Sequence, residues 1–158
     1  MENEKNIKTP HETAAEEYFY SGHNCAQSVL AAFSDMTGIS ERDSFRLGSA
    51  LGGGLCGRRE TCGAVLAMLA VLGSVTERDI TDHEEKKKLY ADGRELVGKF
   101  IAKFDTKECA GLLRGFELKS EPSERTPEYY RKRPCSRFIG GAARLLDEYF
   151  ESCYEKEK

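Results

Sequence analysis

Apolar residues recur along the chain at spacings of three and four, which is the period of one helix face. Nowhere do apolar and polar residues alternate for long enough to predict a sheet. The longest apolar run, from Ala64 to Leu72, is apolar on all sides, which predicts a helix enclosed by its neighbours. The pattern therefore predicts an all-α, single-domain bundle of about six or seven helices around a central apolar helix near residues 61–73.

Capping residues give the approximate bounds of these helices. Thr9-Pro10-His11-Glu12 combines a Thr cap, a first-turn Pro and a capping-box Glu, and predicts a first helix to about Tyr20. Asn24 is expected to cap a second helix and Asp82 a long fifth one. Gly38 is expected to end the second helix, Ser40 to start the third and Gly73 to end the central one. A short helix is expected around Cys109 and a last helix from Pro134. Residues 117–133 are expected to form a polar loop, with Pro122 and Pro127 as helix breakers.

The composition fits one globular domain, which we predict at residues 9–153 after a disordered tail at 1–8. The net charge of −3 gives no general attraction to nucleic acid or to anionic membranes. No apolar segment reaches the roughly 18 residues needed for insertion into a membrane, and the N-terminus lacks the pattern of a secretion signal. We therefore expect a cytoplasmic protein without nucleic-acid partners or membrane insertion.

Six cysteines in a reducing compartment indicate redox chemistry or metal binding in preference to a static disulfide framework. Four of them, Cys25, Cys62, Cys109 and Cys135, fall in or near the first turn of a predicted helix. Helix N-termini expose unpaired N–H groups and a partial positive charge, which lower the pKa of a thiol below its usual ~8.5. The thiolate is both a nucleophile and a metal ligand, so these four cysteines are candidates for either role.

Glycine is concentrated just before the central helix, at Gly52, Gly53, Gly54, Gly57 and Gly63. We interpret this segment as a bend that places the sulfur of Cys62 where chemistry can reach it. The first glycines also match the dinucleotide motif GxGxxG, but they follow a helix and not a strand, so they predict no nucleotide site.

Several neighbours are candidates for supporting roles. Cys56 is a candidate resolving thiol, and His23 is a candidate base or ligand beside Cys25. Basic residues are expected to make the surroundings of Cys62 and Cys135 electropositive, namely Arg58, Arg59 and Arg133. Cys153 continues the apolar face of the last helix and is expected to be structural.

Three motifs together resemble those of a known family. Asn24-Cys25-Ala26-Gln27-Ser28-Val29, Gly52-Gly53-Gly54 and Cys62-Gly63-Ala64-Val65, with the later Cys109 and Cys135, are similar to the motifs of the C_GCAxxG_C_C family. This small bacterial and archaeal family is described as redox-active. The resemblance, over roughly residues 15–150, implies that Cys25, Cys62, Cys109 and Cys135 are the four family cysteines. One departure is visible, because the last glycine of the family's Cys-Gly-Ala-x-x-Gly motif is Ala67 here.

Three functions are consistent with these residues. The first is a redox-active protein, with thiol-dependent oxidoreductase activity as one form, in which Cys62 attacks and a second cysteine resolves the product. The second is a binding module that holds an iron–sulfur cluster or zinc with the same four thiolates. The third is a helical interaction subunit with inert cysteines. The sequence identifies neither the redox partner nor the oligomeric state.

Overall fold

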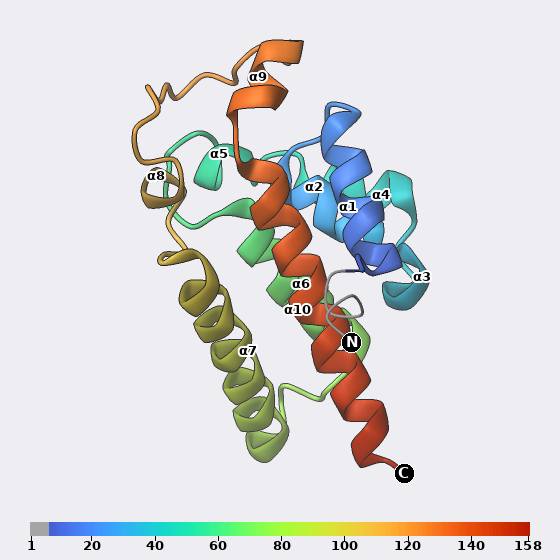
Figure 1. Cartoon of the computed structure of the whole chain (residues 1–158). Coiled ribbons are helices and arrows are strands. Elements are labelled where there is room, and N and C mark those ends of the chain that lie inside the picture. Colours follow the sequence, from blue (N-terminus) through green and yellow to red (C-terminus); the bar gives the residue numbers. More distant parts are fainter. Residues whose placement is uncertain (1–6) are drawn as a thin grey trace.

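A computed structural model describes residues 7–158, which contain ten helical segments (Figure 1). Six have eight residues or more: α1 (Pro10–Tyr20), α2 (Cys25–Ala32), α4 (Glu41–Gly48), α6 (Gly63–Thr76), α7 (His83–Phe104) and α10 (Cys135–Lys156). The shorter ones are α3 (Ser34–Thr37), α5 (Gly52–Leu55), α8 (Cys109–Leu112) and α9 (Pro127–Lys132). Within 7–158 strand-like pairing is limited to one isolated bridge, so the all-α prediction is confirmed. Residues 1–6 of the predicted disordered tail lie outside the described residues.

Local capping explains where the main helices begin. Thr9 and Glu12 form the predicted capping box at the start of α1. Asn24 and Gln27 form a second box at the start of α2, with bonds of 2.9 and 3.0 Å between each side chain and the other residue's backbone N–H. Each box satisfies backbone donors that a helix N-terminus otherwise leaves unpaired.

The apolar helix α6 is buried against three other helices. This helix contacts α2, α7 and α10, and its buried residues include Val65, Met68 and Leu72. The predicted end at Gly73 is wrong, because α6 continues to Thr76 and Glu77 then adopts a left-handed conformation. Helical backbone hydrogen bonds thus continue through the glycine, which alone is a weak stop signal.

The predicted second helix is two helices in the structure. The backbone of the fully buried Phe33 leaves helical geometry, with φ −103° and ψ 18°, and separates α2 from α3. Gly38 then ends α3 in a left-handed conformation, as predicted for the end of this segment.

The predicted polar loop at 117–133 contains a helix. Thr126 caps α9 by accepting the N–H of Tyr129 at 3.1 Å, and Pro127 occupies the first turn. Pro127 therefore starts a helix, where its fixed φ is compatible with helical geometry, and does not act as the predicted breaker.

Together α5, α8 and α9 lie at one end of the bundle, beside the N-terminus of α10 (Figure 1). None of the helices described has a segment that is both long and apolar enough to span a membrane.

His11 links α1 to two carboxylates away from that end. Its Nδ1 lies 2.6 Å from Asp147 and its Nε2 lies 3.0 Å from Asp35. Burial alone lowers the pKa of His11, but hydrogen bonding to both carboxylates and their charges raise it overall above its usual value. The stabilisation from the protonated ring is therefore complete below the pKa of the unfolded chain, about 6.5, and is lost as the pH rises through the folded pKa.

We expect the free energy of unfolding, measured by urea titration, to fall as the pH rises above about 6.5, because His11 loses its proton. His11→Gln should flatten this slope. The exposed His83 is the matched control, and His83→Gln should keep the slope. An unchanged slope in His11→Gln would show that the contacts with Asp35 and Asp147 do not stabilise the fold.

Candidate functional site

The N-termini of four helices meet around a cavity of about 460 Å³. Cys25, Cys109 and Cys135 are the first residues of α2, α8 and α10, and Cys62 is the N-cap of α6. The predicted position of each cysteine at a helix start is thus confirmed. All four residues line the same cavity, although they are spread over more than a hundred positions of the sequence.

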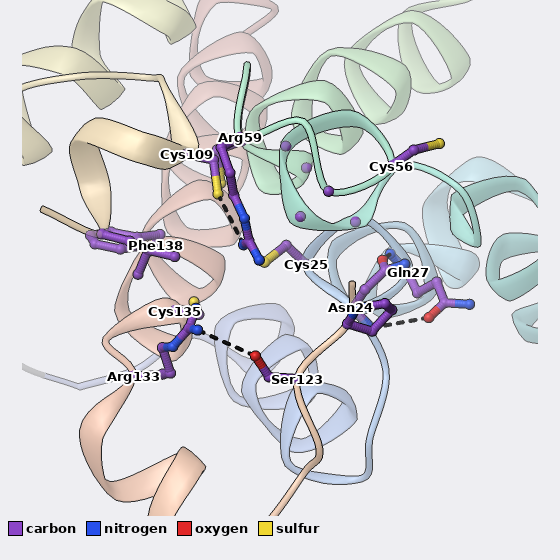
Figure 2. A pocket seen from close by; sticks show the side chains of 18 of the residues that line it. Asn24, Cys25, Gln27, Cys56, Arg59, Cys109, Ser123, Arg133, Cys135 and Phe138 are labelled. Atoms are coloured by element: carbon purple, nitrogen blue, oxygen red, sulfur yellow. Dashed lines mark hydrogen bonds between the residues drawn. The ribbon is translucent and has the colours of Figure 1, made fainter. Parts of the chain in front are cut away.

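The thiol of Cys25 lies near the other three thiols. Figure 2 shows the sulfurs of Cys25, Cys109 and Cys135 turned toward the same space. The sulfurs of Cys135, Cys62 and Cys109 lie close enough to shift the pKa of the Cys25 thiol. Cys62, Cys109 and Cys135 are only 5–8% exposed, whereas Cys25 is half-buried. Cys25 is therefore the least buried of the four residues.

The pKa values of two thiols contradict the expected effect of a helix N-terminus. Hydrogen bonding with Cys135 lowers the pKa of Cys25, but hydrogen bonding with Cys62, burial and the neighbouring sulfurs raise it overall. Hydrogen bonding with Cys25, followed by burial, raises the pKa of Cys135 despite the nearby Arg133. The prediction of lowered pKa values is wrong at these two residues, because loss of water and the adjacent sulfurs outweigh the helix terminus.

The glycine bend is wound in the left-handed sense. All five residues from 53 to 57 have positive φ, between 53° and 79°. Gly54 within this turn is buried, and a Cβ built on it would lie 2.6 Å from the Cβ of Cys109 and 2.7 Å from the amide nitrogen of Glu60. A left-handed conformation costs roughly 1–2 kcal/mol in a residue with a side chain, so glycine permits both the turn and the close approach.

Two further glycines allow α6 to start next to α2. A Cβ on Gly63 would lie 2.8 Å from the carbonyl oxygen of Leu51 and 3.1 Å from the amide nitrogen of Ala26. A Cβ on Gly52 would lie 2.8 Å from the side chain of Asn24, which caps α2. Small residues at these points bring the starts of both helices, and hence Cys62 and Cys25, together.

A short pairing of extended backbone holds Cys62 beside Cys109. The N–H of Cys62 donates to the carbonyl of Lys107 at 2.8 Å, and the N–H of Cys109 donates to the carbonyl of Glu60 at 2.7 Å. Thr61 and Glu108 form the antiparallel bridge between these bonds. No pattern in the sequence predicts this pairing, because it joins two short segments that are far apart along the chain.

Two of the predicted basic residues line the cavity. Arg59 donates from Nη1 to the sulfur of Cys109 at 3.7 Å and from Nη2 to the carbonyl of Lys119 at 2.7 Å. Arg133 donates to the hydroxyl of Ser123 at 3.4 Å (Figure 2). Both guanidinium groups thus border the space into which the cysteines point.

The side chains of three other predicted residues face elsewhere. Cys56 belongs to the cavity lining but is exposed, and its thiol donates to the carbonyl of Ala50 at 2.9 Å and points away from the other labelled sulfurs (Figure 2). His23 stacks on Phe45 with 3.8 Å between ring centroids and does not line the cavity. Arg58 is also outside the cavity lining, where it pairs with Glu60 at 3.2 Å. The sequence neighbours of a cysteine are therefore not all its spatial neighbours.

Arg125 and Tyr129 are cavity residues that the sequence analysis did not single out. The guanidinium of Arg125 lies 4.8 Å from the ring centroid of Tyr129 and 4.9 Å from that of Phe19. Both residues lie in the basic and aromatic stretch 125–137. The basic and aromatic composition of this stretch was the signal available in the sequence, but only the fold shows which of its residues face the cysteines.

The four cysteines do not fit a metal site as they lie. Zinc or an iron–sulfur cluster needs three or four convergent ligands, typically thiolates or imidazoles. Across residues 7–158, no group of three or more His, Cys, Asp or Glu side chains is arranged to hold a metal ion. The predicted alternative of a cluster or zinc site at Cys25, Cys62, Cys109 and Cys135 therefore has no support from the arrangement of their side chains.

Comparison with known proteins gives one match. A model of the family described as "Putative redox-active protein (C_GCAxxG_C_C)" matches residues 23–149. This range includes all four cysteines of the cavity. Neither a curated protein nor a solved structure matches the chain.

Proposed function

The chain belongs to the C_GCAxxG_C_C family, and on this premise we propose that it is a thiol–disulfide redox protein in which Cys25 and Cys135 form a reversible disulfide. The observation that carries the proposal is that Cys25 and Cys135, on two different helices, line one cavity with their sulfurs turned toward the same space. Such a pair gains and loses two electrons without a bound cofactor. Its location in the cytoplasm, where the disulfide can be reduced again, is part of the proposal.

The proposed reaction is exchange with a disulfide substrate. The sulfur of Cys25, the accessible member of the pair, attacks one sulfur of the substrate disulfide, and the first half of the substrate leaves as a thiol. The sulfur of Cys135 then attacks Cys25 in the resulting mixed disulfide, and the second half leaves as a thiol. The two cysteine protons go to the two leaving thiols. Two cysteines are thus oxidised to one disulfide, while one substrate disulfide is reduced to two thiols.

The two thiols of the proposed pair, Cys25 and Cys135, have raised pKa values, and Cys62 lines the same cavity without being a member of the pair. Burial and the neighbouring sulfurs raise the pKa values of Cys25 and Cys135, so their thiolates are scarce near neutral pH. The rate of disulfide formation should accordingly rise as the pH is raised above about 7, because the thiolate fraction increases with pH.

The test is mass spectrometry of the intact chain before and after incubation with a small disulfide, followed by peptide mapping. We expect a loss of about 2 Da per chain, a crosslink between the peptides that contain Cys25 and Cys135, and full recovery of the mass with a reductant. Metal analysis of the same anaerobically purified sample is the companion measurement. A chain that still has six free thiols after incubation with the small disulfide would refute the proposal. Stoichiometric iron or zinc bound by these cysteines would also refute it.

A further inference from the structure

The cysteine cavity carries positive charge in a chain whose net charge is negative. Three arginines line it, Arg59, Arg125 and Arg133, whereas no aspartate or glutamate does. The formal net charge of the whole chain is −3, so this local excess does not follow from composition. Charged groups of one sign around a concave site attract ligands of the opposite sign.

Arg125 has hydrogen-bonding capacity that the protein leaves unused. Its Nη1 is buried and has no hydrogen-bond partner among residues 7–158. The guanidinium lies against the rings of Phe19 and Tyr129, at 4.9 and 4.8 Å from their centroids, and these contacts restrict its movement. A buried donor without a partner is costly, and the cost disappears when a ligand supplies an acceptor.

The other two arginines are only partly satisfied. Arg59 donates to a backbone carbonyl and to the sulfur of Cys109, and Arg133 donates to the hydroxyl of Ser123. In the described part of the chain, none of the three forms an ion pair with a carboxylate, although four other arginines do. Their positive charges are therefore not neutralised by the protein. Guanidinium groups with free donors bind carboxylates and other oxyanions through paired, charge-assisted hydrogen bonds.

We propose that this cavity binds a small disulfide that carries carboxylate groups, with Arg125 and Arg133 holding a carboxylate while the S–S bond lies against Cys25. This inference rests on the proposed thiol–disulfide function and adds the substrate class to it. The cavity, at about 460 Å³, lies within the range of ~300–1,000 Å³ usual for small-molecule sites. The reaction is the exchange already described, in which the bound disulfide is reduced to two thiols and the cysteine pair is oxidised.

A matched set of small molecules separates charge recognition from redox reactivity. Dithiodipropionate is an anionic disulfide, dithiodiethanol is a neutral one, and suberate is a dicarboxylate of similar length without a disulfide. We expect dithiodipropionate to oxidise the full chain at least about tenfold faster than dithiodiethanol. For this comparison, the rate of each disulfide with the protein is divided by the rate of the same disulfide with a free thiol. Suberate should bind in calorimetry and should compete with dithiodipropionate.

Arginine variants then test which residues recognise the carboxylate. Arg125→Met should weaken suberate binding at least about tenfold and should remove the rate preference for the anionic disulfide. Arg133→Met is the second variant, in case loss of the stacked guanidinium at position 125 prevents folding. Arg131→Met is the matched control, because Arg131 is exposed on α9 outside the cavity, and it should change neither readout.

The outcomes distinguish this inference from the proposed function. Equal normalised rates for the two disulfides, together with no suberate binding, would refute the carboxylate site while leaving the disulfide chemistry intact. Suberate binding that depends on Arg125, with no oxidation by either disulfide, would support the anion site and refute the redox function. Suberate binding that survives both Arg125→Met and Arg133→Met would also refute the proposed site.

Discussion

Replacement of Cys25 by serine is expected to abolish the internal disulfide. The sulfurs of Cys135 and Cys62 lie close enough to Cys25 to shift its pKa, and Cys25 is less buried than Cys62, Cys109 and Cys135. Without its sulfur, no substrate is attacked and no crosslink closes across the cavity. After incubation with a small disulfide, peptide mapping of Cys25→Ser should show no internal crosslink, whereas the wild-type chain should show one in most molecules.

Single replacements of the other cysteines assign the pair and provide the controls. Cys135→Ser should stop at the mixed disulfide, with one half of the substrate attached to Cys25, because the resolving sulfur is missing. Cys62→Ser should still form the disulfide, because Cys62 is not a member of the proposed pair. Cys56→Ser and Cys153→Ser should behave as wild type, since neither sulfur belongs to the proposed pair. Loss of the crosslink in Cys62→Ser with its retention in Cys135→Ser would show instead that Cys25 pairs with Cys62.

The positions of the four cysteines at helix starts could be predicted because capping is local. Asn24 and Gln27 are three residues apart, and their reciprocal bonds form within one helical turn. The cap therefore fixes Cys25 at the first position of α2 whatever the rest of the chain does. Where the local signal was incomplete, the prediction failed. Thr126-Pro127 starts a helix just as Thr9-Pro10 does, but Tyr129 stands where a box would need Glu or Gln.

The meeting of the four cysteines could not be predicted, because it depends on contacts between distant segments. The bridge between Thr61 and Glu108 is one of them, and the approach of Gly63 to Ala26 is another. The pKa error has the same origin. A helix N-terminus is a local feature that lowers the pKa of Cys25, whereas burial and the sulfurs of Cys62 and Cys109 are tertiary features, and these prevail.

The overlooked α9 also determines how two arginines of this segment are held beside the cavity. As a loop, residues 117–133 would have offered their arginines to solvent. As a helix, the segment places the ring of Tyr129 against the guanidinium groups of both Arg125 and Arg133, at 4.8 and 5.2 Å. An arginine fixed on an aromatic ring loses less conformational entropy on binding a ligand than a mobile one does. The ordered segment therefore holds the guanidinium donors of Arg125 and Arg133 in defined positions near the cysteines.

Gly54→Ala is expected to be the most destabilising change in the glycine bend. The added Cβ would lie 2.6 Å from the Cβ of Cys109 and 2.7–2.8 Å from backbone atoms of Glu60, so these groups would have to move apart. The φ of +63° adds strain for any residue with a side chain. Strain and overpacking together should lower the free energy of unfolding by about 2–5 kcal/mol in urea titrations.

Gly38→Ala is the matched control, because it introduces the same strain without the collision. Gly38 has a φ of +73°, and no atom lies within 4 Å of the position of a Cβ. Its replacement should cost only about 1 kcal/mol and should leave the cysteine cavity unchanged. Gly54→Ala should in addition disturb the hydrogen bond from Cys109 to Glu60, which holds Cys109 beside Cys62. Equal losses of stability in the two variants would mean that the bend tolerates a side chain at position 54. A greater loss in Gly54→Ala would tie the left-handed turn to the assembly of the four thiols, since the groups displaced are those that position Cys109.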